Sequence, residues 1–119
     1  MRVAIIGSRQ VGPDIDRIIL RYLPADTTEI VSGGAEGVDA AAARVAHSLG
    51  IPLKEFLPDY AAHGKQAPLK RNLSIIDYAE EVLAFWDGES HGTRHVVIEC
   101  IRSGKPVRLI PLSIVSQDR

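Results

Sequence analysis

Short apolar runs alternate with helical stripes along almost the whole chain, and this alternation most constrains the fold. Residues 3–6 form a mostly β-branched run closed by Gly7, and residues 15–23 then carry apolar side chains at helical spacing. The same order recurs, with strands predicted at 29–32, 53–57, 81–86 and 107–110 and helices predicted after Gly37, from Pro68 and near Thr93. Repetition of this kind predicts βαβ units, right-handed crossovers and a parallel sheet covered on both faces.

Five such strands predict a single α/β domain, Rossmann-like and doubly wound, with strand order 3-2-1-4-5. The chain has 119 residues, which is enough for one domain. We place that domain at residues 1–112 and interpret residues 113–119 as a C-terminal tail. Residues 58–67 are predicted to form the longest loop, and Lys54 and Glu55 indicate that the third strand lies at a sheet edge.

Composition argues against a broad nucleic-acid surface, a fold that depends on disulfides and a membrane-spanning segment. Fourteen basic and fifteen acidic residues give a net charge of −1, whereas a domain with a broad nucleic-acid footprint is usually strongly basic. Cys100 is the single cysteine, so the fold needs no disulfide. No apolar run approaches the ~20 residues that cross a bilayer, and Gly7, Ser8 and Arg9 interrupt the first one too early for a signal peptide. We therefore expect a cytoplasmic protein without a membrane partner.

The loops richest in glycine and small polar residues all follow strands. In doubly wound sheets, ligands bind beyond the carboxyl ends of the strands, where the strand order reverses. The candidate ligand-binding residues in these loops are Gly7, Ser8 and Arg9 after the first strand, Ser32, Gly33, Gly34 and Gly37 after the second, and Asp87, Ser90, Gly92 and Thr93 after the fourth. We expect these three loops to meet at one edge of the sheet.

Two interpretations of the glycine loops remain open. A glycine-rich turn that leads into a helix presents free backbone N–H groups to an anion such as phosphate. The same glycines also suit a tight turn at Gly33-Gly34 and close helix–strand packing at Gly37. Likewise, Thr93 suits either a ligand phosphate or a helix cap.

Charged side chains near the same edge complete the candidate site. Arg9 and Arg71, with Asn72 beside it, suit bidentate phosphate binding, although both arginines also fit as surface residues. Asp39 suits either ribose hydroxyls or the positive end of its helix. Trp86 suits either base stacking or core packing.

Familiar cofactor motifs are absent or partial. Gly7 and Gly12 have phosphate-loop spacing, but Pro13-Asp14 stand where lysine and a hydroxyl residue are required. Gly34 and Gly37 fit part of the dinucleotide fingerprint, but Ser32 replaces its first glycine. His91 and His95 lie four residues apart without a third ligand at metal-like spacing. We therefore expect neither a metal nor a bound cofactor.

The ordered motifs resemble the SLOG superfamily, the Rossmann-like group that contains the DNA-processing protein DprA and the LOG cytokinin-activating enzymes. The small stand-alone YspA/YpsA-related SLOG proteins resemble the chain most, over about residues 2–112. The resemblance implies a pocket for a nucleotide or a nucleotide-derived ligand, such as a nucleoside monophosphate or an ADP-ribose-like molecule. The motifs that carry it are Gly7-Ser8-Arg9, Ser32-Gly33-Gly34-Ala35-x-Gly37-x-Asp39, Arg71-Asn72 and Asp87-Gly88-x-Ser90-x-Gly92-Thr93.

The resemblance also offers two alternatives. LOG enzymes cleave the N-glycosidic bond of nucleoside 5′-monophosphates with an arginine, which Arg71 matches, and a glutamate. The glutamate position falls at His95 or Val96 here, so Asp39, Asp87 and Glu89 are the carboxylates left for that role. DprA-like binding of single-stranded DNA is the third interpretation, least favoured by the charge balance and by the few aromatic residues. Relatives often form homodimers, and the sequence leaves that state open.

Overall fold

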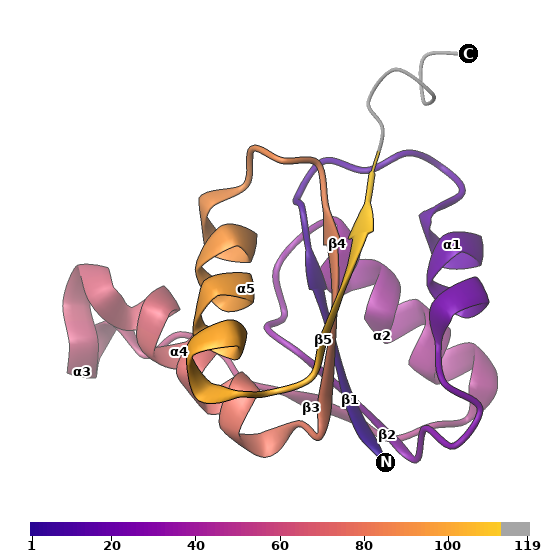
Figure 1. Cartoon of the computed structure of the whole chain (residues 1–119), viewed down its shortest axis with the longest axis horizontal. Helices are drawn as coiled ribbons and strands as arrows, with labels where there is room; N and C mark the ends of the chain where they lie inside the picture. The colour runs from indigo at the N-terminus through magenta and orange to yellow at the C-terminus, as the bar shows by residue number, and fades with distance from the viewer. Residues whose placement is uncertain (113–119) are drawn as a thin grey trace.

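The computed structural model describes residues 1–112 and contains one parallel sheet of five strands (Figure 1). The strands are β1 (Arg2–Gly7), β2 (Glu29–Ser32), β3 (Leu53–Glu55), β4 (Glu81–Trp86) and β5 (Val107–Pro111). They lie in the order β3-β2-β1-β4-β5, with every neighbouring pair parallel. The predicted doubly wound α/β fold and its strand order are confirmed.

Helices cover both faces of the sheet, because the buried strands are apolar on both sides. The helices α1 (Ile15–Tyr22) and α2 (Val38–Leu49) pack on one face, and α4 (Ala67–Tyr78) and α5 (His91–Ser103) pack on the other. Side chains alternate along each strand, so Ile5 joins the core under α1 and α2, whereas Ile6 joins the core under α4 and α5. No helix within residues 1–112 has the length and apolar character needed to cross a bilayer.

Some predicted boundaries were wrong. The segment predicted as a loop over 58–67 contains α3 (Tyr60–His63) and the 3-10 helix η1 (Gly64–Gln66), and the Asp59 side chain caps α3 by accepting the N–H of Ala62. Helix α5 begins two residues before Thr93, since Ser90 is its cap. The third strand is shorter than predicted and ends at Glu55. The predicted tail, residues 113–119, lies outside the described residues.

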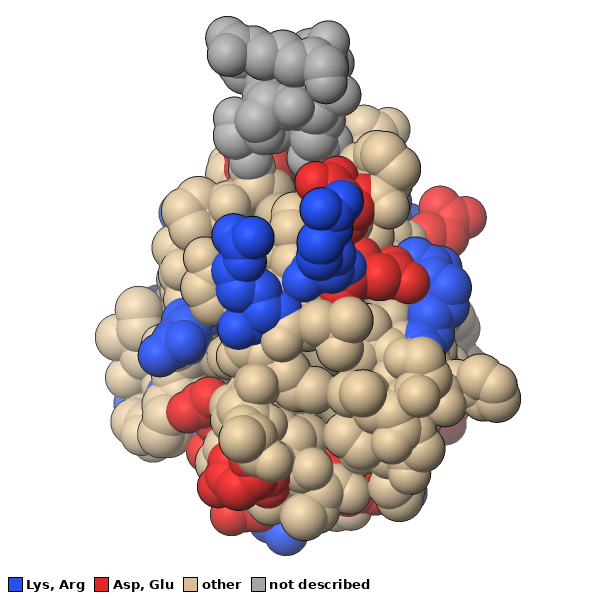
Figure 2. Space-filling model, turned by 90° about the vertical axis from the view of Figure 1, so that its right-hand side faces the viewer, with Lys and Arg blue, Asp and Glu red and all other residues tan. Residues whose placement is uncertain are grey.

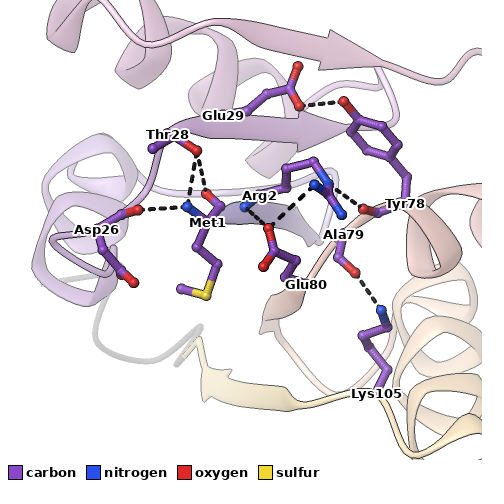
Figure 3. Close-up of polar contacts among 9 residues, drawn as sticks. All are labelled: Met1, Arg2, Asp26, Thr28, Glu29, Tyr78, Ala79, Glu80 and Lys105. Atoms are coloured by element: carbon purple, nitrogen blue, oxygen red, sulfur yellow. Dashed lines mark hydrogen bonds and ion pairs between the residues drawn. The ribbon is translucent and has the colours of Figure 1, made fainter.

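Polar contacts hold the amino-terminal ends of the strands together (Figure 3). The Met1 ammonium group donates to the carbonyl oxygen of Asp26 at 2.8 Å and to the Thr28 hydroxyl at 3.0 Å. Arg2 Nε donates to the carbonyl oxygen of Tyr78 at 2.8 Å, and the Arg2 backbone N–H donates to Glu80. These contacts tie the start of β1 to the segments that precede β2 and β4. The loops that follow the strands therefore lie at the opposite edge.

The outer face of α1 and α2 carries charges of both signs (Figure 2). Lys and Arg side chains cross the middle of this face, with Asp and Glu side chains beside them. Arg44 on α2 donates two hydrogen bonds to the Asp16 carboxylate on α1, at 3.0 and 2.8 Å. Because acidic groups accompany the basic ones, this face does not present a field of a single sign.

Two glycines allow β1, β4 and α2 to approach one another closely. A Cβ atom on Gly7 would collide with the carbonyl oxygen of Phe85 on β4 and with the Val38 side chain. Gly37 has φ 71° and ψ −121°, and a Cβ atom there would collide with the carbonyl oxygens of Ser8 and Arg9. Both positions therefore need glycine for space, and Gly37 also needs it for its backbone conformation.

We predict that Gly37→Ala destabilises the fold more than Gly64→Ala does. Gly64 has a similar backbone conformation, φ 57° and ψ −134°, but a Cβ atom there meets nothing within 4 Å. Both substitutions introduce the same backbone strain, so the difference between their free energies of unfolding reports the collision at Gly37. We expect this difference to be about 1–3 kcal/mol. Urea denaturation measures both variants, and equal losses would contradict this explanation.

Candidate functional site

A cavity of about 490 Å³ opens at the carboxyl ends of β1, β2 and β4. This volume lies within the range of small-molecule sites, roughly 300–1,000 Å³. Most of the predicted ligand-binding residues line the cavity, namely Gly7, Arg9, Gly33, Asp39, Arg71, Asn72, Asp87, Ser90, Gly92 and Thr93. The structure thus brings the three predicted loops and the start of α4 together around one space.

Ser8 lies beneath this space and connects its three loops. It is buried, with 1% of its surface exposed, and does not line the cavity. Its N–H donates to the carbonyl oxygen of Phe85 at 3.1 Å, and its own carbonyl oxygen accepts the Val38 N–H at 3.0 Å. Its hydroxyl oxygen accepts the Asp87 N–H at 3.1 Å. Ser8 therefore fixes β4, the start of α2 and the loop after β4 relative to β1.

Three other predicted residues also lie outside the cavity lining. The Ser32 hydroxyl oxygen accepts the N–H of Gly34 at 3.2 Å and so shapes the turn after β2. Gly34 has φ 73° and faces Leu57. Gly37 supports the close approach of α2 to the loop after β1. In the structure these residues shape the turns, as the packing interpretation predicts, and their role in ligand binding stays a prediction.

The Arg71 guanidinium is held in place by three acceptors. Nη1 donates to the carbonyl oxygens of Gly33 at 2.6 Å and Phe56 at 3.3 Å, and Nε donates to Asn72 Oδ1 at 3.0 Å. Its Nη2 makes no hydrogen bond within residues 1–112 and is free to donate to a ligand. Burial lowers the pKa of Arg71, and the nearby Asp39 carboxylate opposes that effect.

Asp39 is the buried carboxylate of the site. It is 6% exposed, and its Oδ2 accepts the N–H of Ala35 at 3.2 Å. Burial raises the pKa of Asp39 above its usual value, while backbone N–H groups and the charge of Arg71 act in the opposite direction. Gly33 separates these two side chains, because a Cβ atom there would lie 2.6 Å from Arg71 Nη1 and 2.9 Å from Asp39 Oδ2.

Asp87 and Ser90 organise the loop between β4 and α5. Asp87 Oδ1 accepts the N–H groups of Glu89 at 2.8 Å and Ser90 at 3.1 Å, and the hydrogen bond from Glu89 is the main cause of the lowered pKa of Asp87. Ser90 caps α5 by accepting the N–H of Thr93. The cap is therefore Ser90 and not Thr93, for which the sequence had suggested this role. Trp86 Nε1 donates to the Ser90 carbonyl oxygen at 3.0 Å, so the indole holds this loop rather than lining the cavity.

The remaining charges around the opening are exposed. Arg9 and Glu89 both line the cavity, and the Arg9 side chain makes no hydrogen bond or ion pair within residues 1–112. The N–H groups of His91 and Gly92, at the start of α5, also face no acceptor in the described part of the chain. The opening thus offers guanidinium groups and backbone donors to an anion.

Sequence reasoning missed the apolar lining of the cavity. Ile6, Ile75 and Val96 line it, and all three also belong to the core between the sheet and helices α4 and α5. Their helical or strand periodicity indicated burial but not exposure to a cavity at one end. His91 also lines the cavity, although the sequence considered it only as a metal ligand.

The sequence predicted His95 or Val96 at the position that LOG enzymes give to their glutamate, and the structure shows the surroundings of both residues. Val96 is 2% exposed and lines the cavity, whereas the neighbouring His95 hydrogen-bonds Asn72. Glu99 lies elsewhere and pairs with Arg102 at 3.1 Å. Of the three candidate carboxylates, Asp39 and Asp87 each accept backbone N–H groups, whereas the exposed Glu89 side chain accepts no hydrogen bond within residues 1–112.

We predict that Ser8→Ala destabilises the protein by about 1–3 kcal/mol, because the part-buried Asp87 N–H loses the hydroxyl of the buried Ser8 as its acceptor. The exposed Ser74 is the matched control, and Ser74→Ala is expected to change stability by less than about 0.5 kcal/mol. Urea denaturation measures both variants. An equal effect of the two substitutions would contradict the connecting role of Ser8.

We predict that Asp39→Asn stabilises the ligand-free protein at neutral pH. A carboxyl group whose pKa is raised by folding binds its proton more tightly in the folded protein. Its contribution to stability therefore falls as pH rises from the pKa of the unfolded chain through the pKa of the folded protein. The gain in melting temperature should therefore grow as pH rises above 3.8, the ordinary value for this group. Thermal melts from acidic to neutral pH measure it.

Asp16→Asn is the control with the opposite sign. The hydrogen bond from Arg44 lowers the pKa of Asp16 in the folded protein. The ionised carboxylate therefore stabilises the fold at pH values above its ordinary pKa, and this stabilisation is lost as pH falls. Asp16→Asn should therefore lose stability at neutral pH. A gain for Asp16→Asn, or a loss for Asp39→Asn, would contradict the assigned causes.

Two known proteins are similar to this chain. The Gene 61 protein of Mycobacterium phage D29 is 36% identical over 84 residues, which cover 66% of this chain and 67% of that protein. The X-ray structure of DNA processing protein A (DprA) from Streptococcus pneumoniae matches with a TM-score of 0.78 at 21% identity, over 98% of this chain and 52% of that chain. This likeness shows a shared fold, and the chain spans about half the length of DprA. No family model matches the chain.

Proposed function

Because the chain belongs to the family of the Gene 61 protein of Mycobacterium phage D29 and has the fold of DprA, we propose that its cavity binds a phosphorylated nucleoside or an ADP-ribose-like ligand. The DprA-like fold supports the SLOG superfamily, and the narrower placement among YspA/YpsA-related proteins is part of this proposal. The ligand is either sensed or processed.

The observation that carries the proposal is the set of anion-binding groups around one cavity. Arg9 and the free Nη2 of Arg71 supply positive charge, and the start of α5 supplies backbone N–H donors. A phosphate would lie near the Gly33–Gly37 turn and the turn at Gly92-Thr93. The apolar lining suits a base, and Asp39 and Asp87 would accept hydrogen bonds from ribose hydroxyls.

Cleavage of an N-glycosidic bond is the enzymatic form of this proposal. Such a reaction develops positive charge on the ribose and needs a carboxylate beside it. Arg71 would hold the phosphate, and Asp39, Asp87 or Glu89 would supply the carboxylate. Incubation with nucleoside monophosphates and detection of free base distinguishes this form from ligand binding alone.

Binding of single-stranded DNA is the second candidate, and the fold of DprA favours it. Phosphate contacts make DNA affinity fall steeply with salt. Net charge and the mixed charges on the α1–α2 face favour a small anion instead (Figure 2). A gel shift with single-stranded DNA at two salt concentrations tests this candidate.

We predict that AMP or ADP-ribose binds the wild-type protein and that Arg9→Gln weakens the binding by about tenfold or more, since a charge-assisted hydrogen bond is lost. Arg9 makes no hydrogen bond or ion pair within residues 1–112, so its replacement should leave stability unchanged. Arg17→Gln is the matched control, because Arg17 is exposed on α1 away from the cavity. Isothermal titration calorimetry measures all three proteins.

Arg71→Lys extends this test, because lysine keeps the charge but cannot reproduce the fork of hydrogen bonds to Gly33, Phe56 and Asn72. We expect weaker binding than in the wild type. Absence of binding by AMP, ADP-ribose and the other common nucleotides would refute the proposal. Equal losses in Arg9→Gln and Arg17→Gln would place the ligand elsewhere.

A further inference from the structure

A chain of hydrogen bonds leads from the cavity into the interface between α4 and α5. Arg71 Nε donates to Asn72 Oδ1 at 3.0 Å, and Asn72 Nδ2 lies 3.3 Å from His95 Nδ1. Asn72 is 6% exposed and His95 is half-buried. His95 does not line the cavity, so any effect on a ligand would act through Asn72 and Arg71.

The chemistry of these groups fixes the direction of each hydrogen bond. A guanidinium has donors only, so the Asn72 side chain must present its oxygen to Arg71 and its NH₂ group to His95. His95 Nδ1 must then accept, which requires a neutral imidazole with its proton on Nε2. Protonation of Nδ1 would set one N–H group against another and break this contact.

We propose that His95 is a positioning residue for anion binding, which rests on the function proposed above. Neutral His95 holds the amide of Asn72, and Asn72 holds the Arg71 guanidinium with Nη2 free for the ligand. Protonation of His95 releases Asn72 and loosens Arg71, so affinity for an anion decreases as pH falls. A simple charge effect has the opposite sign, because a protonated imidazole attracts anions.

Other titratable side chains on α4 and α5 determine which control variants the test needs. His91 lines the cavity itself, and its protonation would favour an anion, so the binding arm uses a His91→Gln background. Glu99 is paired with Arg102, and the strand residues packed beneath α5 are apolar. The other charged or titratable side chains of the two helices are His91, Arg94, Glu99, Cys100 and Arg102 on α5 and Lys70, Arg71, Asp77 and Tyr78 on α4.

The first measurement needs no ligand. In ¹⁵N-labelled protein near neutral pH, the ring nitrogens of His95 should report a proton on Nε2 and none on Nδ1. On acidification the Arg71 Nε–H signal should shift with the same midpoint as His95, and in His95→Gln it should stay constant. A proton on Nδ1 near neutral pH, or an Arg71 Nε–H signal that does not change as His95 is protonated, would overturn the proposal.

The second measurement uses ADP-ribose. Each of its two phosphates is esterified to a ribose and joined to the other by an anhydride bond, so neither has a second ionisation and the charge stays constant in this range. Its affinity should fall about 5- to 10-fold between about pH 7.5 and pH 5.5, because the hydrogen bond from Arg71 Nε to Asn72 Oδ1 is lost. In His95→Gln the glutamine oxygen replaces the acceptor, so affinity should persist and its pH dependence should disappear. His95→Ala should bind weakly at both pH values.

The two arms separate the failure of each proposal. An unchanged pH dependence in His95→Gln, or affinity that rises on acidification, would refute the positioning role. If neither ADP-ribose nor AMP binds at any pH, the proposed function fails, and the signals of His95 and Arg71 still decide whether His95 positions the guanidinium.

Discussion

The site depends on the close approach of β1, β4 and the start of α2. Ser8 makes this approach specific, because its N–H, carbonyl oxygen and hydroxyl each bond a different segment. Gly7 and Gly37 make it sterically permissible, since side chains there would collide with neighbouring backbone oxygens. One buried residue and two glycines therefore allow these segments to pack closely beside the cavity.

Charge in the cavity is arranged around the half-buried Arg71 and the buried Asp39. Arg71 and Asp39 lie on either side of Gly33, and burial disfavours the charged form of each. Within residues 1–112, Gly33, Phe56 and Asn72 accept from Nη1 and Nε of Arg71 and leave Nη2 without a partner. A preorganised guanidinium loses little freedom on binding, which favours recognition of a small anion.

Local patterns predicted most of the fold. The predicted strands 29–32 and 81–86 match β2 and β4, and the helix predicted after Gly37 matches α2, because apolar runs and helical spacing are local signals. The short helices α3 and η1 were missed, since residues 60–66 are exposed and show no apolar residues at helical spacing. Trp86 was interpreted as either a base-stacking or a core residue, and Ser8 was predicted to bind a ligand. In the structure both make hydrogen bonds that hold loops.

The sequence by itself determined the strand–helix order, the parallel sheet and the edge at which glycines, arginines and carboxylates gather, because these follow from periodicity and chain topology. Tertiary structure alone decided which of those residues face the cavity and which support it. Ser8 and Gly37 lie outside the lining, whereas Ile75 and Val96 lie within it. The physical reason is that hydrogen-bond partners such as Asn72 and His95 are distant in the chain and meet only through packing of α4 on α5.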